Sequence, residues 1–438
     1  MAIVPGPETG ISPPPAPAFA AKRRGRMPRW ALLTIVIVLI VAGMANMGVV
    51  LSFGLGPLGI AIGLAAAVLP VPVLVACFMW LDRFEPEPKH YLVLTFLWGA
   101  FVATSVAYWT NTGASNLLPD ALVGVLVAPF IEEIMKAAFP LAVLWFRREK
   151  ISGFTDAIVY CGLSAVGFAM VENILYLGGH GFASSYEQYG PASGVASVFA
   201  LFLARIFMSG FAHPLFTAMT GIGIGFAARA SQTWVRVLAP LPGLILAMML
   251  HGAWNLMALL SADRGPYVFL YGYVAVMVPI FLGMAGLALW LRAHEGRLAV
   301  RMLPVYAAAG WMSPPEVAAM ATLSGRHAAR TWARRVAGEP GRRAMKEFQA
   351  AATRLAIVRD NLDRGLDTYT AADEHQMLQR IVNARNVYAA RDPQMPQAFW
   401  DGNAYHITFP DGQTRVVGPP AEPVVPLPIQ LSPVGVHY

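Results

Sequence analysis

Long apolar segments fill the chain as far as Arg292 and constrain its fold more than any other feature. A helix needs about 20 consecutive apolar residues to cross the hydrocarbon core of a bilayer. The composition points the same way, since 13% of the residues are charged and 56% are hydrophobic, whereas a soluble domain carries about 25% charged residues. We therefore expect an all-α polytopic membrane protein embedded in the lipid bilayer. About eight transmembrane helices are predicted, near residues 31–53, 57–81, 92–111, 120–146, 154–178, 206–228, 236–260 and 267–291.

Basic residues between the predicted helices indicate the orientation of the chain. The clusters within 22–29, 147–150, 229–236 and 292–301 fall on one side, and the loops on the other side hold a single arginine. Cytoplasmic loops of membrane proteins carry an excess of Lys and Arg. A multi-pass protein of the cell (plasma) membrane with both termini in the cytoplasm is therefore predicted. The formal net charge of +7 reflects this topology, so no nucleic-acid partner is expected.

The segment 193–229 is compatible with two span assignments. It is long enough for one span preceded by a short helix that carries Arg205, or for two short spans. Two spans would break the alternation of basic and uncharged loops, so a single span is predicted.

Four regions are predicted along the chain. Residues 1–30 are expected to form a disordered basic cytoplasmic tail, and residues 31–292 a transmembrane domain. Residues 293–415 are expected to form a cytoplasmic helical region, the part expected to bind a cytoplasmic partner. It ends in a β-hairpin, because "AFWDGNAYHITFPDGQTRVV" alternates around turn dipeptides. Residues 416–438 are rich in proline and are expected to be a disordered tail.

Four consecutive predicted helices carry polar residues, and this pattern is the main functional signal. A charged residue near the bilayer centre costs about 2.5–3.5 kcal/mol and usually faces a bundle interior or a wet cavity. A single intramembrane histidine is more often a structural hydrogen-bond partner than a ligand. Two histidines and three glutamates at similar depth instead favour a functional site. The motifs are "EEIMK" with Glu132, Glu133 and Lys136, "FAMVEN" with Phe168, Glu172 and Asn173, "HPLFT" with His213 and Thr217, and "HGAWN" with His251 and Asn255.

These residue types indicate hydrolysis of an amide bond. Two His and one Glu are a recurrent ligand set for catalytic Zn²⁺. A further carboxylate can act as general base, and an amide or ammonium group can stabilise the developing oxyanion. A Glu and a His could also activate the water together without a metal. Zn²⁺ is the predicted cofactor, because three carboxylates against Lys136 leave two negative charges that a cation would balance.

The ordered set of four motifs resembles the PrsW family of membrane-embedded proteases over about residues 60 to 290. The chain is more distantly similar to the CAAX prenyl protease and bacteriocin-processing (CPBP) group. In that group the second motif ends in His and the first in Arg, so Glu172 and Lys136 favour PrsW. Thr217 occupies a position at which some members of the PrsW family carry Asp.

The resemblance implies a membrane-embedded endopeptidase of the metalloprotease type that cuts membrane-anchored proteins near the outer leaflet. Glu132 or Glu133 is the predicted general base. Asn255 and Lys136 are predicted to stabilise charge during the reaction. The predicted metal ligands are Glu172, His213 and His251.

Two other functions also fit intramembrane Glu, His and Lys residues. Proton-coupled transporters use such residues as relays. However, the sequence has no repeat halves and no paired helices broken by Gly or Pro of the kind that flank a transport site. A catalytically inert membrane scaffold is the second alternative, and the intact set of acids and histidines argues against it.

Overall fold

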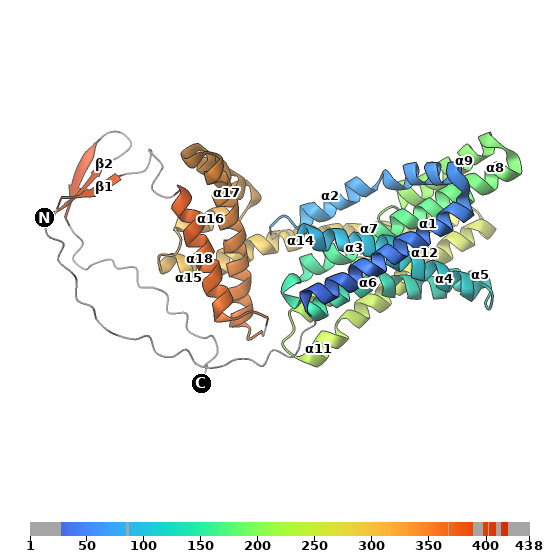
Figure 1. Cartoon of the computed structure of the whole chain (residues 1–438), viewed down its shortest axis with the longest axis horizontal. Helices are drawn as coiled ribbons and strands as arrows, with labels where there is room; N and C mark the ends of the chain where they lie inside the picture. Colours follow the sequence, from blue (N-terminus) through green and yellow to red (C-terminus); the bar gives the residue numbers. More distant parts are fainter. Residues whose placement is uncertain are drawn as a thin grey trace.

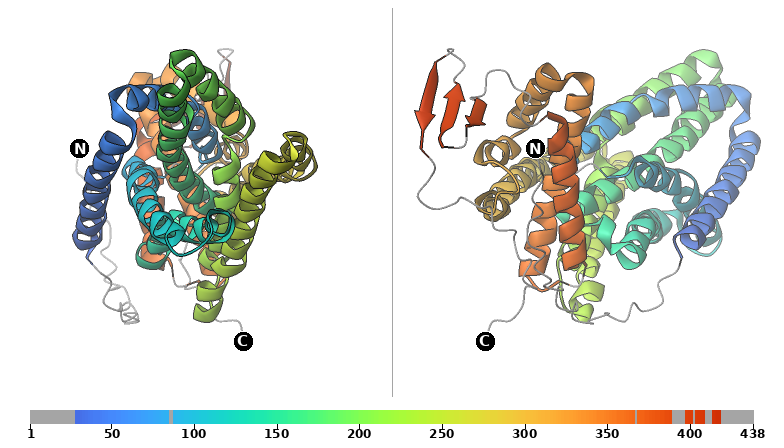
Figure 2. Two further views of the ribbon diagram at one scale, coloured as in Figure 1. Left: turned by 90° about the vertical axis from the view of Figure 1, so that its right-hand side faces the viewer. Right: turned by 60° about the vertical axis from the view of Figure 1, so that its left-hand side comes forward.

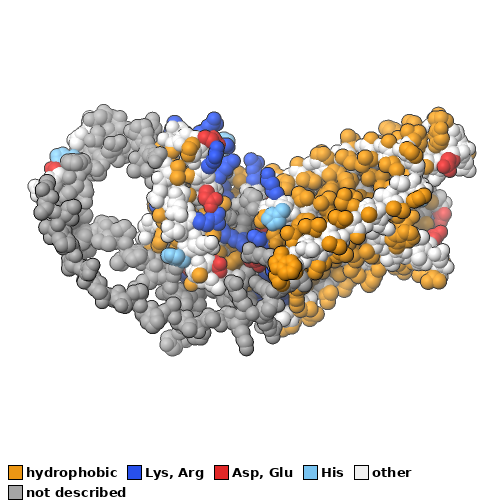
Figure 3. Space-filling model, viewed as in Figure 1, with side chains coloured by type: hydrophobic (Ala, Val, Ile, Leu, Met, Phe, Trp, Pro, Cys, Tyr) orange, Lys and Arg blue, Asp and Glu red, His pale blue; other side chains and the backbone are white. Residues whose placement is uncertain are grey.

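The computed structural model describes residues 28–84, 87–366, 368–388, 397–401, 403–408 and 413–418. These residues form a long helical bundle, with a smaller helical unit and a small sheet beyond one end of it (Figure 1). Hydrophobic side chains cover the bundle, while Lys and Arg gather over the smaller unit (Figure 3). The predicted all-α membrane class is confirmed. The tails predicted for 1–30 and 416–438 lie almost entirely outside the described residues.

Six helical segments in the described part of the chain are long and apolar enough to cross a membrane. The predicted number of about eight is not confirmed. One difference lies at the start, where two predicted helices form one run: α1 (Arg29–Val68) kinks at Gly56, which has a φ of 66°, and is followed by α2 (Val71–Leu81). The six segments are Trp30–Leu81, Lys89–Ser115, Phe154–Tyr189, Pro191–Ala228, Thr233–Arg264 and Tyr267–Ala308.

A second difference concerns the predicted helix at 120–146. This stretch is helical, as α5 (Asp120–Leu122), η2 (Val123–Val127) and α6 (Ala128–Phe146). It is absent from the six segments because it carries three charged residues, Glu132, Glu133 and Lys136, within five positions. The charged residues that make this helix a candidate for the functional site therefore also distinguish it from the six apolar segments.

The segment 193–229 matches the expected single span preceded by a helix. It consists of α9 (Pro191–Phe202), the π-helical η5 (Leu203–Met208) and α10 (Ala212–Ala228), and together they make one of the six apolar segments. Arg205 lies in η5, close to the break before α10. The other elements of the bundle are α3 (Lys89–Leu97), η1 (Trp98–Ala103), α4 (Thr104–Ser115), η3 (Arg148–Lys150), α7 (Phe154–Ile174), η4 (Leu175–Ala183), α8 (Ser184–Tyr189), α11 (Thr233–Leu238), α12 (Pro240–Arg264), α13 (Tyr267–Gly272), η6 (Tyr273–Met277) and α14 (Val278–Met302).

Helix α7 is the most buried helix of the bundle, and neighbouring helices surround it (Figure 2). Glycines allow those neighbours to approach closely, as small residues do at helix interfaces in membranes. A Cβ atom at Gly99 would lie 1.8 Å from the carbonyl oxygen of Ser164, and one at Gly167 would lie 2.0 Å from that of Phe96. This packing fixes the C-terminal half of α7, which carries Glu172.

The helical extension has its own core and also contacts the bundle. It comprises α15 (Pro304–Ala308), α16 (Pro314–Met320), α17 (Leu323–Asp363) and α18 (Ala371–Tyr388). Helix α14 joins the two parts, since its Ala299 is buried in the core of the extension. Asp360 pairs with Arg229 of the bundle at 3.6 Å and with Arg301 at 2.9 Å. The extension is thus anchored to the bundle by buried contacts and by ion pairs.

The predicted hairpin is part of a three-stranded antiparallel sheet with the order β1-β2-β3. Strand β1 (Gln397–Trp400) pairs with β2 (Tyr405–Thr408), with Phe399 opposite His406. Strand β3 (Thr414–Val417) adds to the other edge of β2.

Candidate active site

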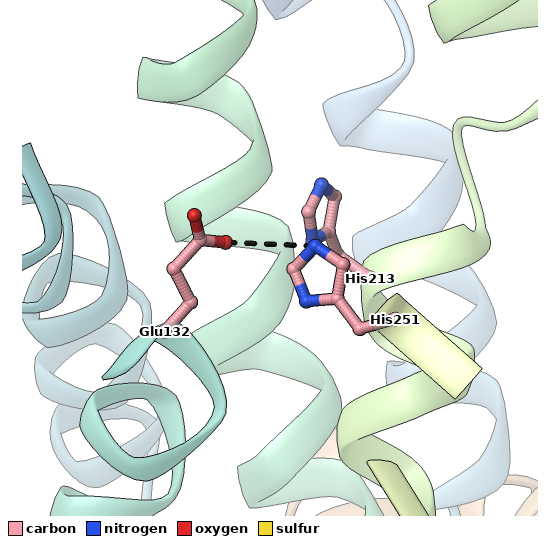
Figure 4. Close-up of side chains that lie close together, drawn as sticks. All are labelled: Glu132, His213 and His251. Carbon is pink, nitrogen blue, oxygen red and sulfur yellow. Dashed lines mark ion pairs between the residues drawn. The ribbon is translucent and has the colours of Figure 1, made fainter. Parts of the chain in front are cut away.

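The four polar motifs meet inside the bundle, on α6, α7, α10 and α12. One ligand atom each from Glu132, His213 and His251 lies within 4.8 Å of the other two. Figure 4 shows the three side chains converging from their helices, with an ion pair of 3.7 Å between Glu132 Oε2 and His251 Nε2. The carboxylate of this group is therefore Glu132, whereas the sequence predicted Glu172 as the partner of the two histidines.

Glu133 and Lys136 form a fully buried layer behind this group. Glu133 Oε1 lies 2.9 Å from Lys136 Nζ and 3.0 Å from His251 Nδ1. Its other oxygen accepts a hydrogen bond of 2.7 Å from the Thr217 hydroxyl. Because a carboxylate only accepts hydrogen bonds, His251 Nδ1 carries the proton in this contact. Its Nε2 is then the nitrogen that faces Glu132.

Both ring nitrogens of His213 have polar partners. Nδ1 lies 3.0 Å from Lys136 Nζ, and Nε2 lies 3.0 Å from Glu172 Oε2. An ammonium group can only donate, so Nδ1 accepts and Nε2 donates to Glu172. Lys136 Nζ also lies 4.1 Å from the ring centroid of Phe168, the aromatic residue of the second motif. Lys136 therefore links α6, α7 and α10.

Arg205 is a member of the site that the sequence did not assign. Its Nη2 lies 2.5 Å from Glu172 Oε2. Three carboxylates therefore share two cations, Lys136 and Arg205, and the excess is one negative charge rather than the two predicted from the motifs. The signal was present in the sequence, because a lone arginine inside an apolar segment needs a partner.

A cavity of about 1650 Å³ opens onto the site. Its lining includes Glu132, Glu172, His213, His251 and Asn255, and it does not include Glu133, Lys136 or Thr217 among the described residues. Asn255 Nδ2 donates one hydrogen bond of 2.8 Å to the carbonyl of Gly124. An amide nitrogen has two hydrogens, so a second one is left for the cavity. The polar residues thus divide into a cavity-facing set and a buried supporting layer.

The cavity-facing set fits a metal ion in its donor types and spacing. Two imidazoles and a carboxylate are the donors of many catalytic zinc sites. A carboxylate on the second ring nitrogen, as Glu133 provides for His251, is the usual support of a metal-binding histidine. His213 would have to release either Lys136 or Glu172 to become a ligand.

The chain is similar to known membrane proteases. A family model described as PrsW family intramembrane metalloprotease matches residues 87–307, which contain all four motifs. Protease PrsW of Geobacillus kaustophilus is 26% identical over 237 residues, covering 52% of this chain and 88% of the relative. Protease PrsW of Bacillus subtilis is 25% identical over 198 residues, covering 44% and 80%. No solved structure matches the chain.

These matches select among the functions that the sequence left open. They favour a protease over the transporter and over the inert scaffold, because the relatives bear the name of a protease and span the motifs that build the site. With its helical membrane domain and its cluster of acids and histidines, the chain belongs to the PrsW family of membrane proteases.

Proposed function

We propose that this protein hydrolyses peptide bonds of membrane-anchored proteins at a site within the bilayer, near the outer leaflet. The observation that carries the proposal is the convergence of Glu132, His213 and His251 at the wall of a large cavity inside the bundle. A hydrolase needs a water molecule beside groups that accept its proton and stabilise the oxyanion. The cavity brings those groups together inside the helical bundle, which supports cleavage of a membrane-anchored chain there.

Glu132, His213 and His251 are the residues that would hold a metal, and Zn²⁺ suits this donor set. When bound, the ion would lower the pKa of its water and polarise the substrate carbonyl. This assignment exchanges the roles that the sequence suggested for two glutamates. Glu132 replaces Glu172 as the carboxylate ligand.

Glu172 is then the residue placed to accept the proton of the attacking water. It lines the cavity and contacts His213, one of the two histidines of the cluster. Glu133 is less suited to this role, because it is fully buried and its oxygens contact Lys136, Thr217 and His251. Glu133 instead orients His251 through Nδ1.

The remaining polar residues have two different roles, one in contact with the substrate and one in support of the site. Asn255 lines the cavity with one amide hydrogen free for the substrate carbonyl, so it stabilises the oxyanion. Lys136 is fully buried and contacts both glutamates of the first motif, so it balances their charge rather than touching the substrate.

The proposed orientation places both termini in the cytoplasm and the site in the outer half of the bilayer. It rests on the distribution of Lys and Arg between the loops. Substrates would then be cut close to the outer leaflet.

Purified protein reconstituted with single-span membrane proteins tests this function, with metal content measured beside cleavage. We expect about one zinc per chain, and cleavage that a chelator abolishes and zinc restores. Glu132→Gln should lose both zinc and cleavage. Glu172→Gln should keep zinc while its rate falls about 10²–10⁴-fold, the usual contribution of a general base.

His90→Ala is the control, because His90 is exposed at the start of α3, away from the cavity lining. Unchanged cleavage in both Glu132→Gln and His251→Ala would refute the function. Loss of zinc in Glu172→Gln with retention in Glu132→Gln would reverse the two roles.

A further inference from the structure

Arg205 has three close contacts in the site, and neither the family motifs nor the proposed function gives it a role. It lies in η5, within one of the apolar segments. An arginine inside an apolar segment is costly and is usually paired with another charged or polar group. Its Nη2 is 2.5 Å from Glu172 Oε2 and its Nε is 2.9 Å from Asn173 Oδ1. The guanidinium carbon lies 3.8 Å from the ring centroid of Tyr176.

These contacts fix the side chain in a way that only arginine allows. A planar guanidinium can donate to two neighbouring acceptors and stack on an aromatic ring at the same time, whereas a lysine ammonium acts as a point charge. The three partners are close in sequence, with Glu172 and Asn173 at the end of α7 and Tyr176 in η4. Arg205 therefore binds the C-terminal end of α7 at Glu172, which lines the cavity.

The same glutamate oxygen connects Arg205 to the histidine cluster. Glu172 Oε2 accepts from Arg205 and lies 3.0 Å from His213 Nε2. Arg205 and Glu172 both line the cavity, with side chains 25% and 14% exposed. A change at Arg205 would thus free Glu172 to rotate relative to His213 and would remove the cation that balances its charge.

Arg205 belongs to an arm formed by α9 and η5. Helix α9 packs on η4 and α8, and its face residues Val195 and Phe199 are exposed. Ile206 of η5 is buried in a hydrophobic cluster with Ile174 and Leu177, so the arm packs against the end of α7 and against η4, and Arg205 adds an ion pair with Glu172.

We propose that Arg205 is a positioning residue, which holds Glu172 in its orientation toward His213 and balances its charge during proteolysis. The proposal rests on the proposed function, since Glu172 is the proton acceptor there. A purely structural ion pair is the alternative, and it would change stability without a specific effect on turnover.

The test compares Arg205→Ala, Arg205→Lys, Glu172→Gln and the Arg205→Ala/Glu172→Gln double variant in the reconstituted protein. Supporting groups of an active site typically contribute about 10–100-fold. Arg205→Ala should lower kcat by that factor, with KM within about twofold and zinc content unchanged. Arg205→Lys should recover part of the loss, because it keeps the charge but not the contact with Asn173.

The double variant decides whether Arg205 acts through Glu172. Residues that act as a unit lose function together, so Arg205→Ala should have less than about a twofold effect in the Glu172→Gln background. Independent, multiplicative losses or a wild-type kcat in Arg205→Ala would overturn the proposal. Arg297→Ala, which is exposed in α14 and lies outside the cavity lining, is the control and should behave as wild type.

Failure of the proposed function gives a different result. The wild-type protein would then cleave no substrate, and Glu132→Gln would be indistinguishable from it. Thermal unfolding of the wild type, Arg205→Ala, Glu172→Gln and the double variant still measures the coupling of Arg205 to Glu172. Additive shifts would overturn the positioning contact, and non-additive shifts would support it.

Discussion

Replacing Glu133 by glutamine should destabilise the protein strongly, because it leaves a buried ammonium group underpaired. Glu133 and Lys136 are both 0% exposed, and their charged atoms lie 2.9 Å apart. Removing one partner of such a pair costs about 3–5 kcal/mol. Glu132 still lies 3.4 Å from Lys136 Nζ in the variant, so we expect a loss near the lower limit, about 3 kcal/mol.

The double variant Glu133→Gln/Lys136→Met separates charge from packing. Replacing both members of a buried pair by groups of similar volume is often close to neutral. Its stability should therefore exceed that of the single variant. Cleavage should stay impaired in both, by about 10–100-fold, because His251 loses the carboxylate on its Nδ1.

Thermal unfolding in detergent, followed by tryptophan fluorescence, gives the stability order, and the reconstituted assay gives the rates. Thr217→Val is a milder variant for comparison, because it leaves both buried charges in place. It removes one hydrogen bond to Glu133 and should cost about 1.5–3 kcal/mol, at most as much as Glu133→Gln. A Glu133→Gln protein as stable as wild type would refute this reasoning. So would a double variant less stable than the single one.

Two further predictions concern topology and packing. Reporter fusions or cysteine labelling should place Tyr438 in the cytoplasm and the loop around Tyr186 outside, because loops rich in Lys and Arg alternate along the chain with loops that hold few of them. An externally labelled C-terminus would contradict the proposed orientation. Gly99→Leu should abolish accumulation of folded protein, because the added Cβ would lie 1.8 Å from the backbone oxygen of Ser164. Gly113→Leu should accumulate normally, because a Cβ there would meet no neighbouring group within 4 Å outside its own stretch of helix. Equal accumulation of these two variants, measured by fluorescence-detected size exclusion, would show that α7 does not pack as described.

The sequence alone determined the class of the protein and the members of its main motifs. Apolar segments long enough to cross a bilayer require helices, because backbone groups must be paired within the segment. Polar residues on four such helices, in three of them one turn apart, predicted a shared site, and Glu132, Glu172, His213 and His251 do meet around one cavity. The number of apolar spans was less predictable. Hydropathy does not show that two predicted helices are continuous. The charged helix predicted at 120–146 does lie in the bundle, although it is not among the six apolar segments.

Only the tertiary structure decided which side chain of each motif faces the cavity. Glu132 and Glu133 are adjacent, about 100° apart around α6, and the rotation of that helix places the first at the cavity and the second against Lys136. Arg205 reaches Glu172 from a helix 33 positions away in the chain, and only packing creates such a contact. Helical periodicity specifies which residues share a face of one helix. The rotation and pairing of helices depend on the packing of all of them, and here they assign Glu132 to the histidines and Arg205 to Glu172.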